Sequence, residues 1–263
     1  GVRGYHSGAP WGLVFHSASG AVHAGSHDTK LVYYGIEFEC ENVGRDYYDS
    51  LTMLENGRYA HAEHDSSLSN GFEVISQPAT AVQWLHGDVG RALRKFHTHM
   101  VDDGATFDHP NVGAHVHVSR GIFGGDSNHL SRFVIFGTHN ERFMRALSGR
   151  GNDDRYAHLN KYDPQTLHRA IKQGRDDRSR WCNLTNDHGT IEIRLFRGSD
   201  HFPDYLAYID MVRALANYTR ELSANDCLFG ALLSQSFVQW LADSPHQMAY
   251  RLVLDRVPVS ELM

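Results

Sequence analysis

The sequence predicts an α+β fold, in which a mainly antiparallel sheet has helices packed on one side. Three observations indicate this class: short alternating strands, a hairpin turn between two of them, and long segments with apolar residues at helical spacing. Strands and helices do not alternate strictly, which argues against a parallel βαβ protein. We see no internal repeat or linker, so we expect one domain over residues 31–263, after an extended N-terminal arm over residues 1–30.

The predicted strands rest on alternation and on turn residues. The first strand is followed by a polar stretch, the second ends at Pro78, and the third shows alternation alone. The last two flank the turn Asn186-Asp187-His188-Gly189, which is typical of a hairpin. A further turn is predicted at Asn56-Gly57. We predict strands over five segments: 31–41, 71–77, 113–119, 180–185 and 190–197.

The predicted helices rest on apolar residues that recur every three to four positions. Pro164 and Pro203 stand where helices can begin, and Gly174 stands where one can end. We predict helices over six segments: 79–101, 128–147, 164–174, 203–222, 229–242 and 246–254.

Composition limits the function classes. The 263 residues are 41% hydrophobic, which is enough for one sizeable core, and the net charge of −6 does not favour nucleic-acid binding. Three cysteines do not make a disulfide framework and fit a reducing compartment. No apolar run reaches the roughly 18 residues of a membrane span, and no signal peptide is visible. We therefore expect a cytoplasmic protein without a membrane partner; the oligomeric state stays open.

A run of alternating glutamates is the first candidate site. In the predicted strand, Glu37, Glu39 and Glu41 share one face, because alternate side chains of a strand point the same way. Like charges at this spacing repel one another. Either the strand is a solvated edge, or a divalent cation neutralises the carboxylates.

Two other strands carry similar residues. His115 and His117 share a face, and such a pair could bind zinc, iron or manganese or be two satisfied histidines. Glu73 enters an otherwise apolar strand, where it either faces an edge or acts as a ligand. Glu192 and Arg194 lie on one face of the last strand, either as a surface ion pair or as a metal ligand and an anion-binding group. One shared polar face would bring these groups together around a cation.

The order of these motifs resembles a known family. Gly-x-Glu-x-Glu comes first, followed by Asp-Ser-Ser-Leu…Asn-Gly-x-Glu-Val-Ile-Ser, Gly-x-His-x-His-Val-Ser and Asn-Leu-Thr-Asn…Gly-Thr-Ile-Glu-Ile-Arg-Leu-Phe-Arg-Gly-Ser. Over residues 31–215 the chain resembles the amidoligase family of phages and bacteria, which is similar in its catalytic core to glutamine synthetase and glutamate–cysteine ligase.

The resemblance implies a curved antiparallel sheet that forms the floor of a funnel. It also implies an ATP- and magnesium-dependent ligase that activates a carboxylate as an acyl phosphate and joins it to an amine. The sequence does not identify either substrate; the amine could be a free amino acid, a polyamine, a peptide or a modified polymer. The N-terminal arm and the last 45 residues or so fall outside the matched region and are expected to choose the acceptor.

The resemblance also assigns roles, position by position. The implied metal ligands are Glu37, Glu39, Glu73, His115 and Glu192. The implied catalytic residues are Glu37, Glu39 and Arg194, with Arg194 facing the transferred phosphoryl group or the substrate carboxylate. The candidate nucleotide-binding residues are His117, Arg178, Arg180 and Arg197. Asp65 is a weaker match to the family pattern.

Two other functions remain open. His115, His117 and one carboxylate could hold zinc or iron in a hydrolase or an oxygenase. Alternatively, the fold could serve a non-catalytic nucleotide-binding or structural protein. The absence of a glycine-rich phosphate loop argues against a P-loop enzyme.

Overall fold

The computed structural model describes residues 13–16, 20–23, 28, 30–44, 47–54, 58–150, 157–159, 164–173, 179–185, 189–228 and 230–258. The chain divides into two compact units. The first unit comprises Gly1–Val118 and Arg197–Leu206, and the second comprises Ser119–Phe196 and Ala207–Met263. The single domain over residues 31–263 therefore stays a prediction, as does the arm over residues 1–30.

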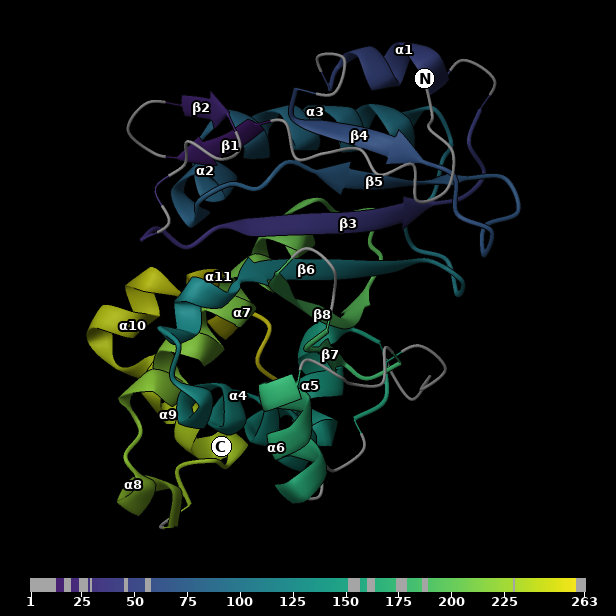
Figure 1. The fold of residues 1–263 in the computed structure, drawn as a ribbon. Coiled ribbons are helices and arrows are strands. Elements are labelled where there is room, and N and C mark those ends of the chain that lie inside the picture. Colours follow the sequence, from purple (N-terminus) through teal and green to yellow (C-terminus); the bar gives the residue numbers. More distant parts are fainter. Residues whose placement is uncertain are drawn as a thin grey trace. The chain divides into compact units, whose positions relative to one another are not determined.

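The strands of the first unit pair antiparallel throughout (Figure 1). Strands β1 and β2 form a hairpin within the predicted N-terminal arm, and the other four are neighbours in the order β4, β5, β3, β6. The bounds are β1 Leu13–His16, β2 Gly20–His23, β3 Tyr34–Cys40, β4 Ala60–Glu63, β5 Phe72–Ser76 and β6 Gly113–Ser119.

Side-chain alternation gives these four strands an apolar and a polar face. Phe38 lies opposite Val74, and Ile36 lies opposite Val116; all four side chains are buried. Burying an aromatic or branched side chain contributes roughly 1.5–3 kcal/mol to the stability of the fold. A shift of one residue would expose these side chains, so their burial determines the register of the strands. The glutamates and histidines of the predicted site consequently lie on the opposite face.

Helices cover the apolar face of the first unit. They are α1 (Tyr47–Thr52), α2 (Ala81–Leu85) and α3 (Asp88–Asp102), and α3 runs along the strands in Figure 1. Helix α3 buries an apolar stripe at helical spacing that includes Leu93 and Phe96. The ring of Phe38 lies 5.6 Å from that of Phe107, measured between centroids.

The single helix predicted over residues 79–101 is wrong, because the structure has two helices there. The break falls at His86 and Gly87. A Cβ at Gly87 would lie 2.1 Å from Oε1 of Gln83, and that oxygen accepts a hydrogen bond from the backbone N–H of Asp88 at 3.0 Å. The side-chain amide thus satisfies a free N–H at the start of α3.

The described residues of the second unit are mainly helical and include the antiparallel strand pair β7 and β8 (Figure 1). The strands are β7 Cys182–Asn183 and β8 Thr190–Arg197, whose last residue belongs to the first unit. The helices are α4 Ser127–His139, α5 Glu141–Ser148, α6 Pro164–Gln173, α7 Pro203–Glu221, α8 Ala224–Leu228, α9 Ser234–Ala242, α10 Ser244–Ala249 and α11 Arg251–Leu254, with a 3-10 turn over Arg120–Phe123.

The helix predicted over residues 128–147 is also two helices, α4 and α5, which meet at Asn140. The side-chain NH₂ group of Asn140 donates to the carbonyls of Phe136 and Leu232, and its Oδ1 accepts from the N–H of Ser234 at 2.8 Å. A polar side chain that bonds to the backbone in this way competes with the helical pattern. The predicted helix over 246–254 is likewise divided, at Tyr250.

The predicted α+β class with a mainly antiparallel sheet is confirmed by these elements. The helices predicted over 164–174 and 203–222 are confirmed to within one residue at each end. Strands β1, β2 and β4 and helices α1 and α8 were not predicted. The predicted turn at Asn56-Gly57 and residues 186–188 of the hairpin turn lie outside the described residues. Within the described part of the chain, every helix is too short or too polar to cross a membrane.

Candidate functional site

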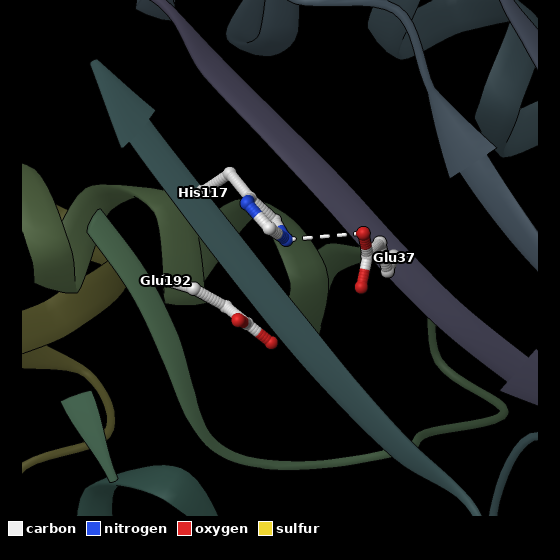
Figure 2. Close-up of side chains that lie close together, drawn as sticks. All are labelled: Glu37, His117 and Glu192. Carbon is white, nitrogen blue, oxygen red and sulfur yellow. Dashed lines mark ion pairs between the residues drawn. The ribbon is translucent and has the colours of Figure 1, made fainter. Parts of the chain in front are cut away.

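Two histidines of the first unit contact one carboxylate. Glu37 on β3 lies opposite His115 on β6, and His117 projects from the same face two residues further along. The distance from His115 Nδ1 to Glu37 Oε2 is 3.2 Å. The distance from His117 Nε2 to Glu37 Oε1 is 3.1 Å, and Figure 2 shows this ion pair as a dashed line. Each oxygen of the Glu37 carboxylate therefore has its own imidazole partner.

These contacts control the charge of Glu37. Burial by itself would raise the pKa of this carboxyl, but the positive charge and hydrogen bonds of His117 and His115 outweigh burial. The pKa of Glu37 is consequently held well below its usual value of 4.5. Glu37 is thus an anion at neutral pH, as a cation ligand must be.

Glu73 has the opposite environment. It lies opposite Glu39 on one neighbouring strand and opposite Glu63 on the other, so three carboxylates stand in a row across β3, β5 and β4. Burial and then the charges of Glu37 and Glu39 raise the pKa of Glu73 well above 4.5. A bound cation would remove this repulsion, because it favours the charged form of every carboxylate around it.

Ligand atoms converge at one point of this face. One donor atom from each of Glu37, Glu73 and His115 lies within 4.8 Å of the others. The backbone N–H of Gly113 donates to Glu39 Oε2 at 2.8 Å, which orients the carboxylate beside Glu73. Two or three carboxylates with one imidazole fit a divalent cation such as Mg²⁺ or Mn²⁺.

Glu41 and Asp65 serve the loop that precedes β5. The two oxygens of Glu41 accept the backbone N–H groups of Ser69 and Asn70, at 2.7 and 2.9 Å. Asp65 Oδ1 accepts the N–H of Ser67 at 2.6 Å. These backbone contacts give a structural explanation for the charge of Glu41, which was not among the implied metal ligands.

The second unit contains Glu192, a predicted metal ligand, and Arg194, the predicted catalytic arginine. Glu192 and Arg194 project from the same side of β8, and Arg194 Nη1 donates to Glu192 Oε1. Asn183 on β7 lies opposite Glu192 and donates from Nδ2 to Glu192 Oε2 at 2.7 Å. Glu192 is buried, so this carboxylate meets the usual requirement that buried charges be paired and hydrogen-bonded.

The other predicted arginines have separate surroundings. Arg180 joins an isolated backbone bridge with His158 in the second unit. Arg197 donates from Nε to Asp108 Oδ1 at 2.8 Å, and both side chains are about half exposed in the first unit. Arg178 lies outside the described residues.

Three polar residues beside the predicted ligands were missed. Glu63 flanks Glu73, and His61 Nε2 lies 3.3 Å from Glu63 Oε1; both come from β4, a strand too short to be predicted. Asn183 belongs to the Asn-Leu-Thr-Asn motif, but no role was inferred for it. The alternation in Ala60–Glu63 and the position of Asn183 across the hairpin from Glu192 are the signals that could have identified them.

No protein-family model matches the chain, and no curated protein matches it.

Proposed function

We propose that this protein is an ATP- and magnesium-dependent carboxylate–amine ligase of the amidoligase type. The observation that carries the proposal is the convergence of Glu37, Glu73 and His115 on the polar face of the first unit, with ligand atoms within 4.8 Å of one another. The order of the four sequence motifs supports the same class. In the proposed reaction, a substrate carboxylate takes the terminal phosphoryl group of ATP, and an amine then displaces phosphate from the acyl carbon.

Glu37, Glu39, Glu73 and His115 would hold magnesium in this proposal. The ion would supply charge neutralisation for the phosphate oxygens, which is the main requirement of phosphoryl transfer. Glu37 is kept anionic by His115 and His117, and Gly113 fixes Glu39 through its backbone N–H. We propose that Glu192 and Arg194 also take part, with Arg194 binding an anionic oxygen group.

The ligase reaction needs no protein nucleophile, and the thiol of Cys40, which stands between Glu39 and Glu41 in the sequence, is poorly suited to be one. Cys40 is fully buried on the apolar face of β3, and its Sγ donates to the carbonyl of Phe72. Burial raises the pKa of this thiol to about 12, so almost none is thiolate at neutral pH. Cys40 therefore gives no support to a cysteine hydrolase.

A transition-metal hydrolase or oxygenase is the second candidate, favoured by the two imidazoles on the Glu37 carboxylate. The carboxylates Glu39, Glu63 and Glu73 beside them favour a hard cation instead. The two candidates differ in the metal bound and in the need for a nucleotide.

The test is ATP turnover by the full chain with Mg²⁺, across a panel of carboxylates and amines, with ADP measured. We expect Glu39→Gln and Arg194→Ala to abolish ADP formation, and the exposed-site controls Asp102→Asn and Arg142→Ala to retain it. Normal turnover in either of the first two variants would remove that residue from the site. Nucleotide binding without turnover for any amine would favour a non-catalytic protein, and tight zinc or iron binding without nucleotide would favour the second candidate.

A further inference from the structure

Three side chains of the second unit form a connected polar chain. Strand pairing places Asn183 directly opposite Glu192, and Arg194 follows two residues later on the same strand. Asn183 Nδ2 donates to Glu192 Oε2 at 2.7 Å, and Arg194 Nη1 donates to Glu192 Oε1. One carboxylate thus joins an amide donor on one oxygen to a guanidinium on the other.

The orientation of the Asn183 amide is fixed from its other end. Its Oδ1 accepts two hydrogen bonds from Thr185, one from the backbone N–H at 3.0 Å and one from Oγ1 at 3.1 Å. A flipped amide would point its NH₂ group at the Thr185 N–H, which is also a donor. The NH₂ group therefore faces Glu192.

Burial makes this arrangement specific. Asn183 is 0% exposed and Glu192 is 4% exposed, so neither group can exchange its partner for bulk water at low cost. Hydrogen bonds to a buried charge are worth more than those between neutral groups, and losing one partner leaves a desolvated charge. Asn183 is thus a buried and oriented donor to one oxygen of the Glu192 carboxylate.

Arg194 has donor capacity left after it contacts Glu192. Its Nε is buried and has no hydrogen-bond partner in the described part of the chain, while its side chain remains 23% exposed. The backbone N–H of Arg194 donates to the carbonyl of Trp181 at 2.8 Å, which fixes the base of the side chain. A guanidinium that is held through Nη1 and keeps an unpartnered Nε is suited to bind a carboxylate or phosphoryl oxygen.

We propose that Asn183 is a positioning residue: it fixes the Glu192 carboxylate, which holds the Arg194 guanidinium ready to bind an anionic oxygen group. The identity of that group as a reacting carboxylate or phosphoryl rests on the proposed ligase function. The positioning of Arg194 by Asn183 and Glu192 rests on their contacts alone.

The reactivity of Arg194 toward phenylglyoxal tests the positioning without any turnover. Modification is followed by mass spectrometry as the ratio of the Arg194 rate to that of Arg132, which donates to the Thr219 carbonyl in the same unit. We expect Asn183→Ala to raise this ratio roughly tenfold, the factor that corresponds to the loss of one charge-assisted hydrogen bond. General loosening of the unit would accelerate the modification of both arginines, so it leaves their ratio unchanged.

Thr185→Val is the matched control. It removes the Oγ1 contact to Asn183 but keeps the backbone N–H that orients the amide. We expect the ratio in this variant to stay within about twofold of that in the unaltered protein, less than the effect of one full hydrogen bond. An unchanged ratio in Asn183→Ala, or an equal rise in both variants, would overturn the positioning role.

Protection experiments identify the anion. A non-hydrolysable ATP analogue with Mg²⁺ and a simple dicarboxylate such as glutarate are each tested for slowing Arg194 modification. Protection by the nucleotide assigns a phosphoryl partner, protection by glutarate assigns a carboxylate partner, and no protection by either overturns the anion-binding role. Because the ratio needs no ADP formation, a raised ratio in a protein without turnover would sink the ligase proposal and leave the positioning of Arg194 intact.

Discussion

At the scale of single residues, Glu37 and Glu73 lie on neighbouring strands, yet their pKa values move in opposite directions. His115 and His117 stabilise the charged form of Glu37, whereas burial and surrounding carboxylates destabilise that of Glu73. On the same face, therefore, the negative charge of Glu37 is balanced by neighbouring histidines, whereas a negative charge on Glu73 would be opposed by neighbouring carboxylates. Such a difference in surroundings is common at functional sites, because a ligand that completes the charge balance can bind there.

His97 provides a pH-dependent contribution to stability away from this face. It is buried against Phe107, with ring centroids 4.2 Å apart, and its Nε2 lies 2.8 Å from the carbonyl of Ser199. Burial lowers the pKa of His97 from 6.5 to about 4. The folded protein thus prefers neutral His97, while the unfolded chain takes up a proton below pH 6.5.

We predict that His97 contributes to a loss of stability as pH falls from 6.5 to about 4. The full contribution is on the order of 3 kcal/mol, since each pKa unit corresponds to about 1.4 kcal/mol. In His97→Gln, which cannot titrate, the free energy of unfolding in urea should change less between pH 7 and pH 4. An identical pH dependence in both proteins would contradict the assignment.

At the scale of elements, the sequence predicted best where one pattern continued without interruption. The alternation in Tyr34–Cys40 was enough to place both the strand and its charged face. The breaks at Gly87 and Asn140 were missed, because each depends on a side-chain amide that bonds to backbone groups. In one case the partner is distant in sequence, at Leu232, so no local pattern could reveal it.

Helix α4 offers a test of packing in the second unit. A Cβ at Gly137 would lie 2.2 Å from Cζ2 of Trp181, a fully buried side chain. Alanine usually favours a helix over glycine by about 1 kcal/mol, but overpacking a core costs about 1–3 kcal/mol. We expect Gly137→Ala to lower the free energy of unfolding in urea by about 1 kcal/mol or more.

The companion variant is Gly137→Ala with Trp181→Phe, because phenylalanine lacks the ring atoms nearest the added methyl group. The double variant should lose less stability than the sum of the two single substitutions. If Gly137→Ala were as stable as the unaltered protein, the close contact between α4 and Trp181 would be refuted.

At the scale of the whole molecule, the sequence predicted which charged residues belong to the candidate site but not which of them contact one another. Alternation predicted that Glu37 and Glu39 share one strand face and that His115 and His117 share another. Strand pairing in the first unit brings these side chains and Glu73 together. Glu63 was missed because it lies on a strand too short to predict. Asn183 lies in a predicted strand, but its role follows only from Glu192, the residue opposite it. The alternation of residues within one strand does not show which residues of a distant strand lie opposite them, so the register between strands could not be predicted.

Ligand-dependent stability is the prediction that belongs to the whole protein. A ligand that binds only the folded state stabilises it by about 2.7 kcal/mol at a concentration of 100 times Kd. We therefore expect ATP with Mg²⁺ to raise the melting temperature, and zinc alone not to replace them.

Glu73→Gln should weaken the effect of Mg²⁺-ATP on the melting temperature while leaving the ligand-free protein at least as stable, because it removes one of the repelling carboxylates. Asp102→Asn, an exposed substitution on α3, should respond as the unaltered protein does. A full Mg²⁺-ATP shift in Glu73→Gln would mean that the nucleotide binds without this carboxylate, and the cation site would then have to be assigned without Glu73.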